Sequence, residues 1–357
     1  MQRGWHTVPV SSDLRIGLLG AAAIAPSALI KPARHTPRVN VTAVAARDRT
    51  RAEAFARKHG VPVVHAGYDA LLADPQVDAV YVPLPNGLHA EWTLKALEAG
   101  KHVLCEKPFT ANRAEAERVA DAADAAFARD GLVVMEAFHY RYHPLAERMR
   151  EIVTSGELGK LRRVEAELCF PLPRFSDIRY DYALAGGATM DAGCYAVHVA
   201  RLLGAGDPAV TSARMTTLRR DPRIDRAMTA ELAFPKGVTG RVRASMWSRR
   251  LLSIRARAIG TDGELNVTNF AMPQLYHQVT IRAPRGSGGQ VVRRERVPRN
   301  PSSYARQLEA FAAAVLDGGP VITSARDAVA TMGVLDGIYR AGGLPLRGEK
   351  KDQAATP

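Results

Sequence analysis

The segment from residue 185 to residue 198 gathers three side chains that can move protons. Asp191, Tyr195 and His198 stand four and three positions apart in the run AGGATMDAGCYAVH. On an α-helix this spacing places a carboxylate, a phenol and an imidazole on one stripe. Such a group is either a satisfied hydrogen-bond network in the interior or a site of general acid–base catalysis. The segment alone is compatible with both.

Two predicted strand ends in the first third of the chain carry further polar side chains. One strand is followed by Glu106 and Lys107, and another by Pro85, Asn86 and His89. Ligands of doubly wound sheets bind beyond the carboxyl ends of the strands, so both segments are placed to line a ligand. A lysine there can hold a substrate oxygen or lower the pKa of a neighbouring group. Lys107 is equally compatible with an exposed structural role.

The first predicted strand runs into a turn of small residues. A dinucleotide-binding turn has the pattern G-x-G-x-x-G/A, because small residues let the pyrophosphate approach the backbone. Gly20, Ala22 and Ala25 occupy the three places, and Ile24 precedes the last. Only the first is glycine, and Ala22 adds a methyl group where the phosphate would approach. The turn predicts cofactor contacts from these four residues, with a ligand-free strand–turn–helix as the alternative.

The end of the second predicted strand indicates which dinucleotide binds. About twenty residues past the glycine turn, an acidic residue would hold the ribose 2′-hydroxyl of NAD(H), whereas an arginine would accommodate the 2′-phosphate of NADP(H). The sequence here reads Ala45-Ala46-Arg47-Asp48, so the arginine comes first. We therefore expect NADP(H), contacted by Arg47 and Asp48. NAD(H) stays open, because Asp48 could hold the ribose or cap the next helix.

The elements that must position these residues alternate along the first part of the chain. Apolar runs typical of strands covered on both faces are separated by helical patterns, which predicts a doubly wound parallel sheet. We assign residues 1–138 to this N-terminal Rossmann-type domain. The expected strands are 14–19, 39–45, 63–65, 79–82, 102–105 and 132–135, and the expected helices are 24–32, 49–59, 69–73, 89–99 and 112–128.

Strand patterns dominate after residue 138. Several of them are joined by short turns, which indicates a mostly antiparallel sheet. We assign residues 139–345 to a C-terminal α+β domain and residues 346–357 to a polar tail. The expected strands are 161–170, 210–218, 228–234, 239–246, 253–259, 278–282 and 290–297, with helices after Pro144 and at 188–203, 304–316 and 325–341.

The composition excludes several classes of protein. The 357 residues are 46% hydrophobic and 24% charged, which is typical of a globular chain of about two domains. No apolar stretch reaches the roughly 20 residues that a membrane-spanning helix needs. The first residues lack the apolar region of a signal peptide, so we expect a cytoplasmic protein. The spacing of cysteines and histidines predicts neither a disulfide framework nor a metal site.

The formal net charge of +13 favours anionic partners such as a phosphorylated cofactor. Much of the excess lies in three arginine-rich segments, 213–226, 241–257 and 282–299, which we interpret as solvated strand faces. No helix-turn-helix, zinc-finger or RNP pattern accompanies the charge. We therefore expect a small-molecule substrate and neither a nucleic acid nor a membrane as partner.

The motifs together resemble those of the glucose–fructose oxidoreductase, inositol dehydrogenase and rhizopine-catabolism (Gfo/Idh/MocA) family of NAD(P)-dependent oxidoreductases. The resemblance covers residues 13–342 and rests mainly on Glu106-Lys107-Pro108 and on the segment 186–198. Within the family the chain is most similar to dimeric dihydrodiol dehydrogenases. The resemblance implies a Rossmann domain and a C-terminal domain with a large open, mostly antiparallel sheet. Family members often form dimers or tetramers through that sheet, so a homodimer or homotetramer is expected.

The resemblance also implies roles for single residues. Lys107 corresponds to the lysine beside the substrate hydroxyl and the nicotinamide, Asp191 to the aspartate that orients the substrate, and Tyr195 to the acid–base residue. The implied reaction is hydride transfer between the nicotinamide and a secondary alcohol or carbonyl of a sugar, polyol or cyclic diol. A free tyrosine has a pKa of about 10, and we expect Lys107 to favour its phenolate.

The resemblance implies that Pro85, Asn86, His89 and Glu106 approach the cofactor and that His198 lines the substrate pocket. Further substrate contacts are expected from Arg141, Tyr142 and Phe170, and the wider pocket from Phe138, His139, Arg174 and Tyr182. Tyr195 is the expected proton donor, with His198 as the alternative. A non-catalytic nucleotide- or sugar-binding regulator of the same fold is the second hypothesis. A regulator has no need of a proton donor, so the joint presence of Lys107, Asp191 and Tyr195 argues against it.

Overall fold

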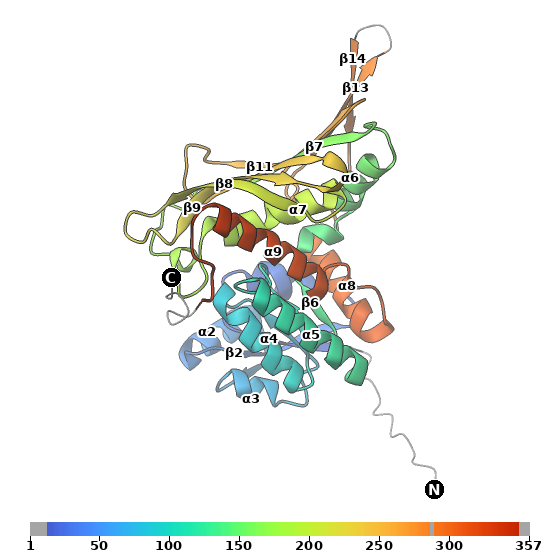
Figure 1. Ribbon diagram of the computed structural model, residues 1–357. Coiled ribbons are helices and arrows are strands. Elements are labelled where there is room, and N and C mark those ends of the chain that lie inside the picture. The colour runs from blue at the N-terminus through green and yellow to red at the C-terminus, as the bar shows by residue number, and fades with distance from the viewer. Residues whose placement is uncertain (1–12, 286–288, 350–357) are drawn as a thin grey trace.

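The computed structural model describes residues 13–285 and 289–349. It consists of two sheets with helices packed between them (Figure 1). The N-terminal sheet lies in the lower half of Figure 1 and the C-terminal sheet in the upper half, and helices α7 (Cys194–Gly204) and α9 (Ala325–Ala341) lie between the two. The predicted combination of an α/β and an α+β part is confirmed.

The N-terminal sheet has six strands in the order β3-β2-β1-β4-β5-β6, and all its neighbouring strands pair in parallel. The order reverses between β1 and β4, as in sheets that bind dinucleotides at this reversal. All six strands were expected within two residues of their observed ends. They are β1 (Leu14–Leu19), β2 (Val39–Ala45), β3 (Val63–His65), β4 (Ala79–Val82), β5 (His102–Cys105) and β6 (Val134–Glu136).

The helix expected at 24–32 has a different form. It is a π-helical turn, η1 (Pro26–Ile30), followed by the short α1 (Lys31–Ala33). The amide of Lys31 donates to the carbonyl of Pro26, five residues back, and Pro32 has no amide hydrogen for an α-helical bond. The other helices around this sheet match the prediction closely: α2 (Arg49–His59), α3 (Tyr68–Leu72), α4 (His89–Glu98) and α5 (Arg113–Asp130).

The C-terminal sheet has eight strands in the order β14-β13-β12-β11-β7-β10-β9-β8. Only β10 and β7 pair in parallel, and the other neighbours are antiparallel. The prediction lacked β12 (Glu264–Thr268), a short strand with two buried apolar residues. The remaining strands are β7 (Leu161–Cys169), β8 (Ala209–Thr217), β9 (Asp225–Ala233), β10 (Thr239–Ser245), β11 (Ser253–Gly260), β13 (Gln278–Arg285) and β14 (Gly289–Glu295).

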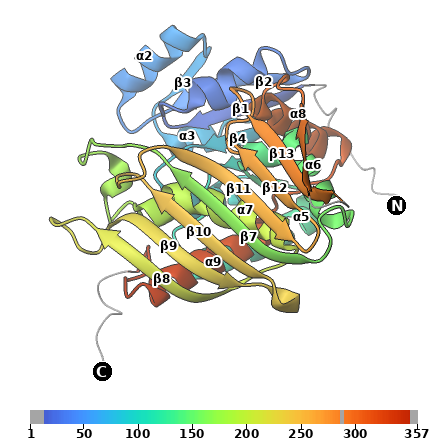
Figure 2. The same ribbon diagram turned by 90° about the horizontal axis from the view of Figure 1, so that it is seen from above.

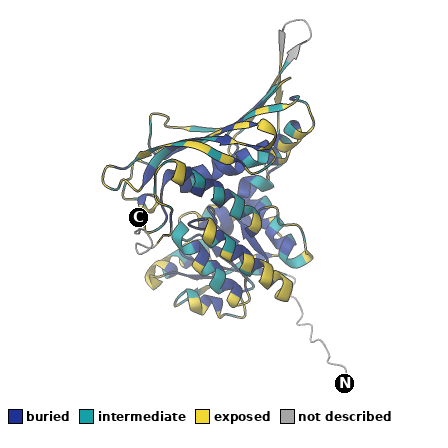
Figure 3. Ribbon diagram, viewed as in Figure 1, coloured by how far each residue is buried: buried dark blue, intermediate teal, exposed yellow. Residues whose placement is uncertain are grey.

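Helices cover only one face of the C-terminal sheet. Helix α7 packs on β7 and β10, and α9 packs on β8. Figure 2 looks onto the opposite face, which no helix of the described residues covers. Buried and exposed residues alternate along these strands (Figure 3), which is the pattern of an antiparallel sheet with one solvated face. Helix α6 (Pro144–Thr154) packs against α7 and β12.

The last two helices join the two halves of the molecule. Helix α8 (Ser303–Asp317) returns to the N-terminal sheet, where Leu308 and Phe311 share a core with Ile16 and Leu18 of β1. Helix α9 packs on α5 as well as under the second sheet. Helix α8 also contacts a short 3-10 turn, η3 (His139–Tyr142), that follows the N-terminal sheet. No helix in the described part of the chain is both long and apolar enough to cross a membrane.

The segment predicted as a polar tail begins with a buried anchor. Arg347 is fully buried, forms an ion pair of 2.9 Å with Asp225, and donates a hydrogen bond of 2.6 Å to the carbonyl of Gly186. The prediction of a polar tail from residue 346 is therefore wrong at Arg347. The side chain of this residue is buried, and Asp225 neutralises its charge. Residues 350–357 lie outside the described part of the chain.

Candidate active site

Two glycines let the loop before the predicted acid–base helix pack closely. A side chain on Gly186 would stand 2.6 Å from the carbonyl oxygen of Arg179, and one on Gly187 would stand 2.2 Å from Oδ1 of Asp225. Gly187 also has a φ of 134°, which other residues rarely adopt. Asp225 in turn accepts hydrogen bonds of 2.6 and 2.7 Å from the amide and hydroxyl of Thr189. These contacts fix where the helix begins.

The helix expected at 188–203 is not α-helical throughout. It opens with a π-helical turn, η5 (Thr189–Gly193), and becomes α-helical only in α7. Asp191 lies in this wider turn, whereas Tyr195 and His198 lie in α7. The predicted single stripe of three side chains is therefore not preserved. Turns of this kind are frequent at functional sites.

Asp191 lies between two cations. Its Oδ1 atom is 3.5 Å from Nζ of Lys107, and its Oδ2 atom is 3.2 Å from Nε of Arg179. Lys107 also donates a hydrogen bond of 3.3 Å to the carbonyl of Asp191. The lysine comes from the end of β5 and the aspartate from η5, so the cluster joins the two halves of the molecule. The predicted approach of Lys107 and Asp191 is present in the structure.

The charges in this cluster support each other. Burial alone would raise the pKa of Asp191, but Lys107 and Arg179 outweigh it and hold the pKa below its usual value. Burial would lower the pKa of Lys107, but Asp191 and Glu106 raise it. Both groups are therefore charged at neutral pH. An ammonium held in this way can hydrogen-bond to a substrate oxygen.

Tyr195 lies beside the cluster and is bonded to a histidine. Nζ of Lys107 is 5.1 Å from the centre of the Tyr195 ring, and the Tyr195 hydroxyl is 3.1 Å from Nε2 of His139. The expectation that Lys107 favours the phenolate is not met. Burial, followed by Tyr304 and Glu106, raises the pKa of Tyr195 well above its usual value. The phenol is therefore protonated at neutral pH.

His198 lies away from this cluster. Its Nδ1 atom is 2.6 Å from the Tyr140 hydroxyl, and its Nε2 atom is 3.2 Å from Asp327. Its ring stacks on Phe138 at 4.1 Å, and Phe138 also contacts Tyr195 edge-on at 5.3 Å. Because both ring nitrogens are engaged, the geometry does not support His198 as a pocket-lining residue or as the proton donor.

The other expected substrate contacts are dispersed. The Tyr142 hydroxyl bonds to Thr323 at 2.8 Å, and that of Tyr182 donates to the carbonyl of Leu346 at 2.7 Å. Phe170 is half-buried between two apolar clusters, and Arg141 is half-exposed on η3. Arg174 is exposed. Among the described residues, no hydrogen bond or ion pair links these side chains to Lys107, Asp191 or Tyr195.

The strand-end segments are held together by hydrogen bonds. Asn86, after β4, donates to the carbonyl of Ala185 at 3.1 Å, which ties this strand end to the loop before η5. His89 places its ring nitrogens 2.8 Å from the carbonyl of Pro108 and 2.7 Å from that of Leu84. Burial lowers the pKa of His89 to about 4, so the neutral ring donates to one carbonyl at a time.

Glu106 and Pro85 complete these segments. Glu106 accepts a hydrogen bond of 2.6 Å from the Tyr81 hydroxyl, and burial raises its pKa. Pro85 precedes a single 3-10 turn, η2 (Asn86–Leu88). Thus His89, Glu106 and Asn86 shape the loop that presents Lys107.

The turn after β1 has the features of a dinucleotide site. Gly20 has a φ of 106°, and a side chain there would stand 3.1 Å from Leu84. The amide of Ala22 donates to the carbonyl of Gly20 at 2.8 Å, which makes the turn tight. Ile24 is exposed and Ala25 is buried, so the turn presents an open surface at the start of the helix. Small residues with an exposed helix start fit a pyrophosphate group.

Two arginines stand near this turn, one just after β2 and one in the first turn of α2. Arg47 is exposed, and Arg51 donates a hydrogen bond of 3.1 Å to the carbonyl of Ala21. Asp48 caps α2 by accepting from the amide of Arg51, as one of the two predicted alternatives has it. The residues present fit a nucleotide that carries an additional phosphate at the ribose.

Sequence reasoning did not find Arg51 or Arg179, and it did not pair His139 with Tyr195. Arg51 lies in the first turn of α2, four positions after Arg47, and its bond to the carbonyl of Ala21 is a contact with a distant segment. Arg179 and Asp191 are joined by a loop without a regular pattern, and His139 is 56 positions from Tyr195 in the chain. Such contacts depend on tertiary packing and leave no local signal.

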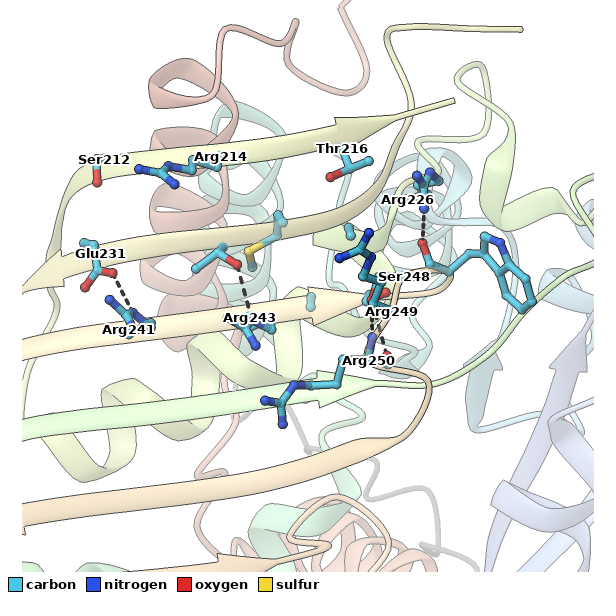
Figure 4. Close-up of a pocket in the computed structure, with 16 residues that line it drawn as sticks. Ser212, Arg214, Thr216, Arg226, Glu231, Arg241, Arg243, Ser248, Arg249 and Arg250 are labelled. Atoms are coloured by element: carbon cyan, nitrogen blue, oxygen red, sulfur yellow. Dashed lines mark hydrogen bonds and ion pairs between the residues drawn. The ribbon is translucent and has the colours of Figure 1, made fainter. Parts of the chain in front are cut away.

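A groove of about 1220 Å³ lies elsewhere, on the open face of the C-terminal sheet. Figure 4 shows its lining side chains, among them Arg226, Arg243 and Arg249, on and beside the strands β8, β9 and β10. None of the predicted site residues lines this groove. The candidate active site and this arginine-rich groove are therefore two separate places on the molecule.

Comparison with known families gives two matches. Residues 14–134 match an oxidoreductase family with an NAD-binding Rossmann fold, designated GFO_IDH_MocA. Residues 146–266 match the GFO/IDH/MocA C-terminal domain. The two matches cover more than half of the chain.

Two related proteins and one solved structure are similar to this chain over most of their length. D-xylose 1-dehydrogenase (NADP(+)) 2 of Haloferax volcanii is 40% identical over 336 residues, covering 92% of this chain and 97% of the relative. Trans-1,2-dihydrobenzene-1,2-diol dehydrogenase of Bos taurus is 36% identical over 254 residues, covering 70% and 72%. A solved structure of a 3-ketoreductase from Actinomadura kijaniata with NADP and TDP-benzene has a TM-score of 0.81 at 31% identity, covering 92% and 98%.

Proposed function

The chain belongs to the GFO/IDH/MocA oxidoreductase family, and from this membership we propose that it transfers a hydride between NADP(H) and a sugar or a related diol. The reacting group is a CH–OH or the corresponding carbonyl. The observation that carries the proposal is the largely buried cluster in which Asp191 and Tyr195 lie beside Lys107, at the carboxyl end of the parallel strand β5. It combines a cation, an anion and a protonated phenol within reach of one another.

Each member of the cluster has a separate task. The Lys107 ammonium donates a hydrogen bond to the reacting oxygen and stabilises negative charge on it. Asp191 keeps this ammonium in place and can accept a hydrogen bond from a neighbouring substrate hydroxyl. Tyr195 is protonated, so in the direction of reduction it donates its proton to that oxygen. The nicotinamide, when bound, supplies or accepts the hydride.

NADP(H) is the favoured cofactor. Gly20, Ala22, Ile24 and Ala25 form the turn for the pyrophosphate, and Arg47 with Arg51 would hold the 2′-phosphate. The relative from Haloferax volcanii is named for NADP(+), and the 3-ketoreductase structure contains NADP. An arginine beside the ribose would favour the phosphorylated cofactor.

The first experiment measures turnover and binding in parallel. The protein is incubated with NADP+ or NAD+ and a panel of aldoses, polyols and cyclic diols, beginning with D-xylose, and NADPH formation is followed by absorbance. Thermal unfolding with NADPH and NADH gives binding independently, because a ligand at about 100 times its Kd stabilises by about 2.7 kcal/mol. Binding of NADPH without turnover of any panel member would favour the non-catalytic hypothesis. Absence of both would contradict the cofactor assignment.

Arg47 gives a test of cofactor choice with a matched control. We expect Arg47→Ala to weaken NADPH binding roughly 10- to 100-fold, the size of one or two lost charge-assisted hydrogen bonds, without changing NADH binding. Arg49→Ala removes the same charge two residues away, where the arginine is paired with Glu53 at 2.9 Å. This control should leave both affinities unchanged. Equal losses in the two variants would point to general electrostatics.

We also propose that a second copy of the chain covers the open face of the C-terminal sheet. Arginine and glutamate side chains alternate on this face. They form ion pairs of 2.6 Å between Arg241 and Glu231 and of 2.7 Å between Arg257 and Glu264. Alternating charges can complement an identical face across a twofold axis. Because exposed charges are screened by salt, light scattering should give a dimer or tetramer that weakens as ionic strength rises. A monomer at low salt would contradict this proposal.

A further inference from the structure

A chain of four hydrogen-bonding side chains begins at the Tyr195 hydroxyl. The hydroxyl is 3.1 Å from Nε2 of His139, Nδ1 of His139 is 2.8 Å from Oγ of Ser303, and Ser303 donates to Oε1 of Gln274 at 2.7 Å. His139 and Ser303 are buried, with 1% and 0% of their surfaces exposed. The residues come from α7, η3, α8 and the loop after β12, so the chain exists only in the folded protein.

The acceptor at the end of this chain, the side-chain oxygen of Gln274, determines which group donates in each hydrogen bond. The Gln274 oxygen can only accept, so the Ser303 hydroxyl donates to it and must accept from His139. Nδ1 of His139 therefore carries the hydrogen. Burial, followed by Lys107, lowers the pKa of His139 to about 3, so the ring is neutral and its Nε2 atom has a free lone pair. It follows that Tyr195 donates to His139.

We propose that His139 is a positioning residue for Tyr195. Its Nε2 atom holds the phenolic hydrogen on the side of His139, and this leaves the lone pairs of the Tyr195 oxygen for the hydroxyl of the substrate. The ring is kept in place by stacking on Tyr304 at 3.9 Å with an interplanar angle of 29°. The role in the reaction rests on the proposed function, whereas the direction of the hydrogen bonds does not.

This arrangement gives Tyr195 a defined state before the reaction. Without an acceptor at Nε2, the buried hydroxyl would point at the alcohol oxygen or stay unsatisfied, and the Tyr195 oxygen could not take up the hydrogen of the alcohol. With the acceptor, the Tyr195 oxygen receives a hydrogen bond from the alcohol. As the alcohol is oxidised, its hydroxyl hydrogen passes to the Tyr195 oxygen and the phenolic hydrogen passes to Nε2 of His139. In the direction of reduction the same two hydrogens move back, so Tyr195 donates to the carbonyl oxygen. His139 thus favours the complex with the alcohol over the complex with the carbonyl.

Two substitutions separate the two ends of the His139 ring. The amide nitrogen of asparagine can take the place of Nδ1, so His139→Asn keeps the bond to Ser303 but removes the acceptor for Tyr195. Glutamine reaches the place of Nε2, so His139→Gln keeps the acceptor. We expect His139→Asn to lower kcat about 100-fold, the cost of a misplaced reacting group, and His139→Gln to recover at least about a tenth of the wild-type value. KM for the alcohol and Tm should differ little between the two.

The substrate for this test is the panel member with the highest turnover. Equal losses of kcat in the two variants, or a parallel fall of kcat and Tm, would overturn the positioning role and leave a structural one. Tyr140→Phe, which removes the equivalent hydroxyl from the neighbouring pair, controls for the loss of a buried hydrogen bond outside the cluster.

A second measurement needs no turnover. Nitrogen NMR of selectively labelled histidine distinguishes the two neutral tautomers, and the His139 variants assign the signals. We expect His139 to carry its hydrogen on Nδ1, and His198, which faces the carboxylate of Asp327 through Nε2, to carry it on Nε2. A hydrogen on Nε2 of His139 would overturn the inference even if the enzyme is active. Absence of turnover with every panel member would contradict the proposed function, and the tautomer would then decide this inference alone.

Discussion

Two tyrosine–histidine pairs cross between the same two segments of the chain, and they are connected in opposite directions. Tyr195 of α7 bonds to His139 of η3, whereas Tyr140 of η3 bonds to His198 of α7. All four side chains are buried, with at most 9% of their surfaces exposed. Residue type and burial therefore do not distinguish the pair beside the cluster of Lys107 and Asp191 from the other pair.

The group behind each imidazole makes the difference. Nδ1 of His139, the ring nitrogen that faces away from the tyrosine, bonds to the neutral hydroxyl of Ser303. The corresponding nitrogen of His198, Nε2, bonds to the carboxylate of Asp327, which also forms an ion pair of 2.8 Å with Arg201. A carboxylate fixed by an arginine locks the ring and ties α7 to α9. A hydroxyl fixes only the tautomer, and the ring remains an acceptor beside the cluster. The comparison shows that the role of a buried histidine is set by its second partner.

Removing the hydroxyl of each tyrosine gives the largest expected contrast. Tyr195→Phe should lower turnover roughly 10²- to 10⁴-fold, because it removes the proposed acid–base group, while stabilisation by NADPH is retained. Tyr140→Phe should change turnover little but lower the free energy of unfolding by about 1–3 kcal/mol, because Nδ1 of His198 loses its donor. Kinetics and denaturant unfolding of both variants measure the contrast. Similar kinetic losses in the two would mean that the pairs act as one unit.

Much of the fold could be predicted because its signals are local. The strands of the N-terminal sheet are uninterrupted apolar runs, as β1 (Leu14–Leu19) illustrates, and their positions were expected within two residues. Strand β12 (Glu264–Thr268) was missed because it has only two buried apolar residues, Leu265 and Val267. Its place is set by pairing with β11 and β13, which no single segment reveals.

The candidate site was predictable only in part. Lys107, Asp191 and Tyr195 were found through motifs, and the structure brings them together. The spacing wrongly placed Asp191 on one stripe with Tyr195 and His198, because the π-helical turn before α7 changes the register. That turn depends on contacts between distant segments, such as the bonds from Thr189 to Asp225. A pattern within one helix cannot contain this information.

Removing the group behind each histidine should give a smaller contrast. Asp327→Asn takes a charge away from Arg201 and His198, and because the aspartate is 32% exposed we expect a loss of about 2 kcal/mol in unfolding free energy. Ser303→Ala removes neutral hydrogen bonds and should cost about 1 kcal/mol. Kinetics should show the reverse order, with turnover lowered by Ser303→Ala. A greater kinetic effect of Asp327→Asn would assign the working pair to His198.

The smallest contrast is in the dependence of stability on pH. Burial lowers the pKa of His198 to about 4 and that of His139 to about 3 from the usual 6.5. Between about pH 6.5 and pH 4 the unfolded chain therefore binds protons that the folded chain does not, and stability falls as the pH falls. In each case, replacing the histidine by glutamine should reduce this slope by up to about 1.4 kcal/mol per pH unit, the contribution of one proton. Urea unfolding at a series of pH values measures the slopes. If His198 were instead protonated beside Asp327, its pKa would be raised above the usual value. His198→Gln would then leave the slope below about pH 6 unchanged and would remove a loss of stability that sets in as the pH rises above about 6.5, whereas His139→Gln would still make the lower slope shallower. That pair of results would show that the carboxylate outweighs burial, and the two imidazoles would then differ in charge as well as in direction.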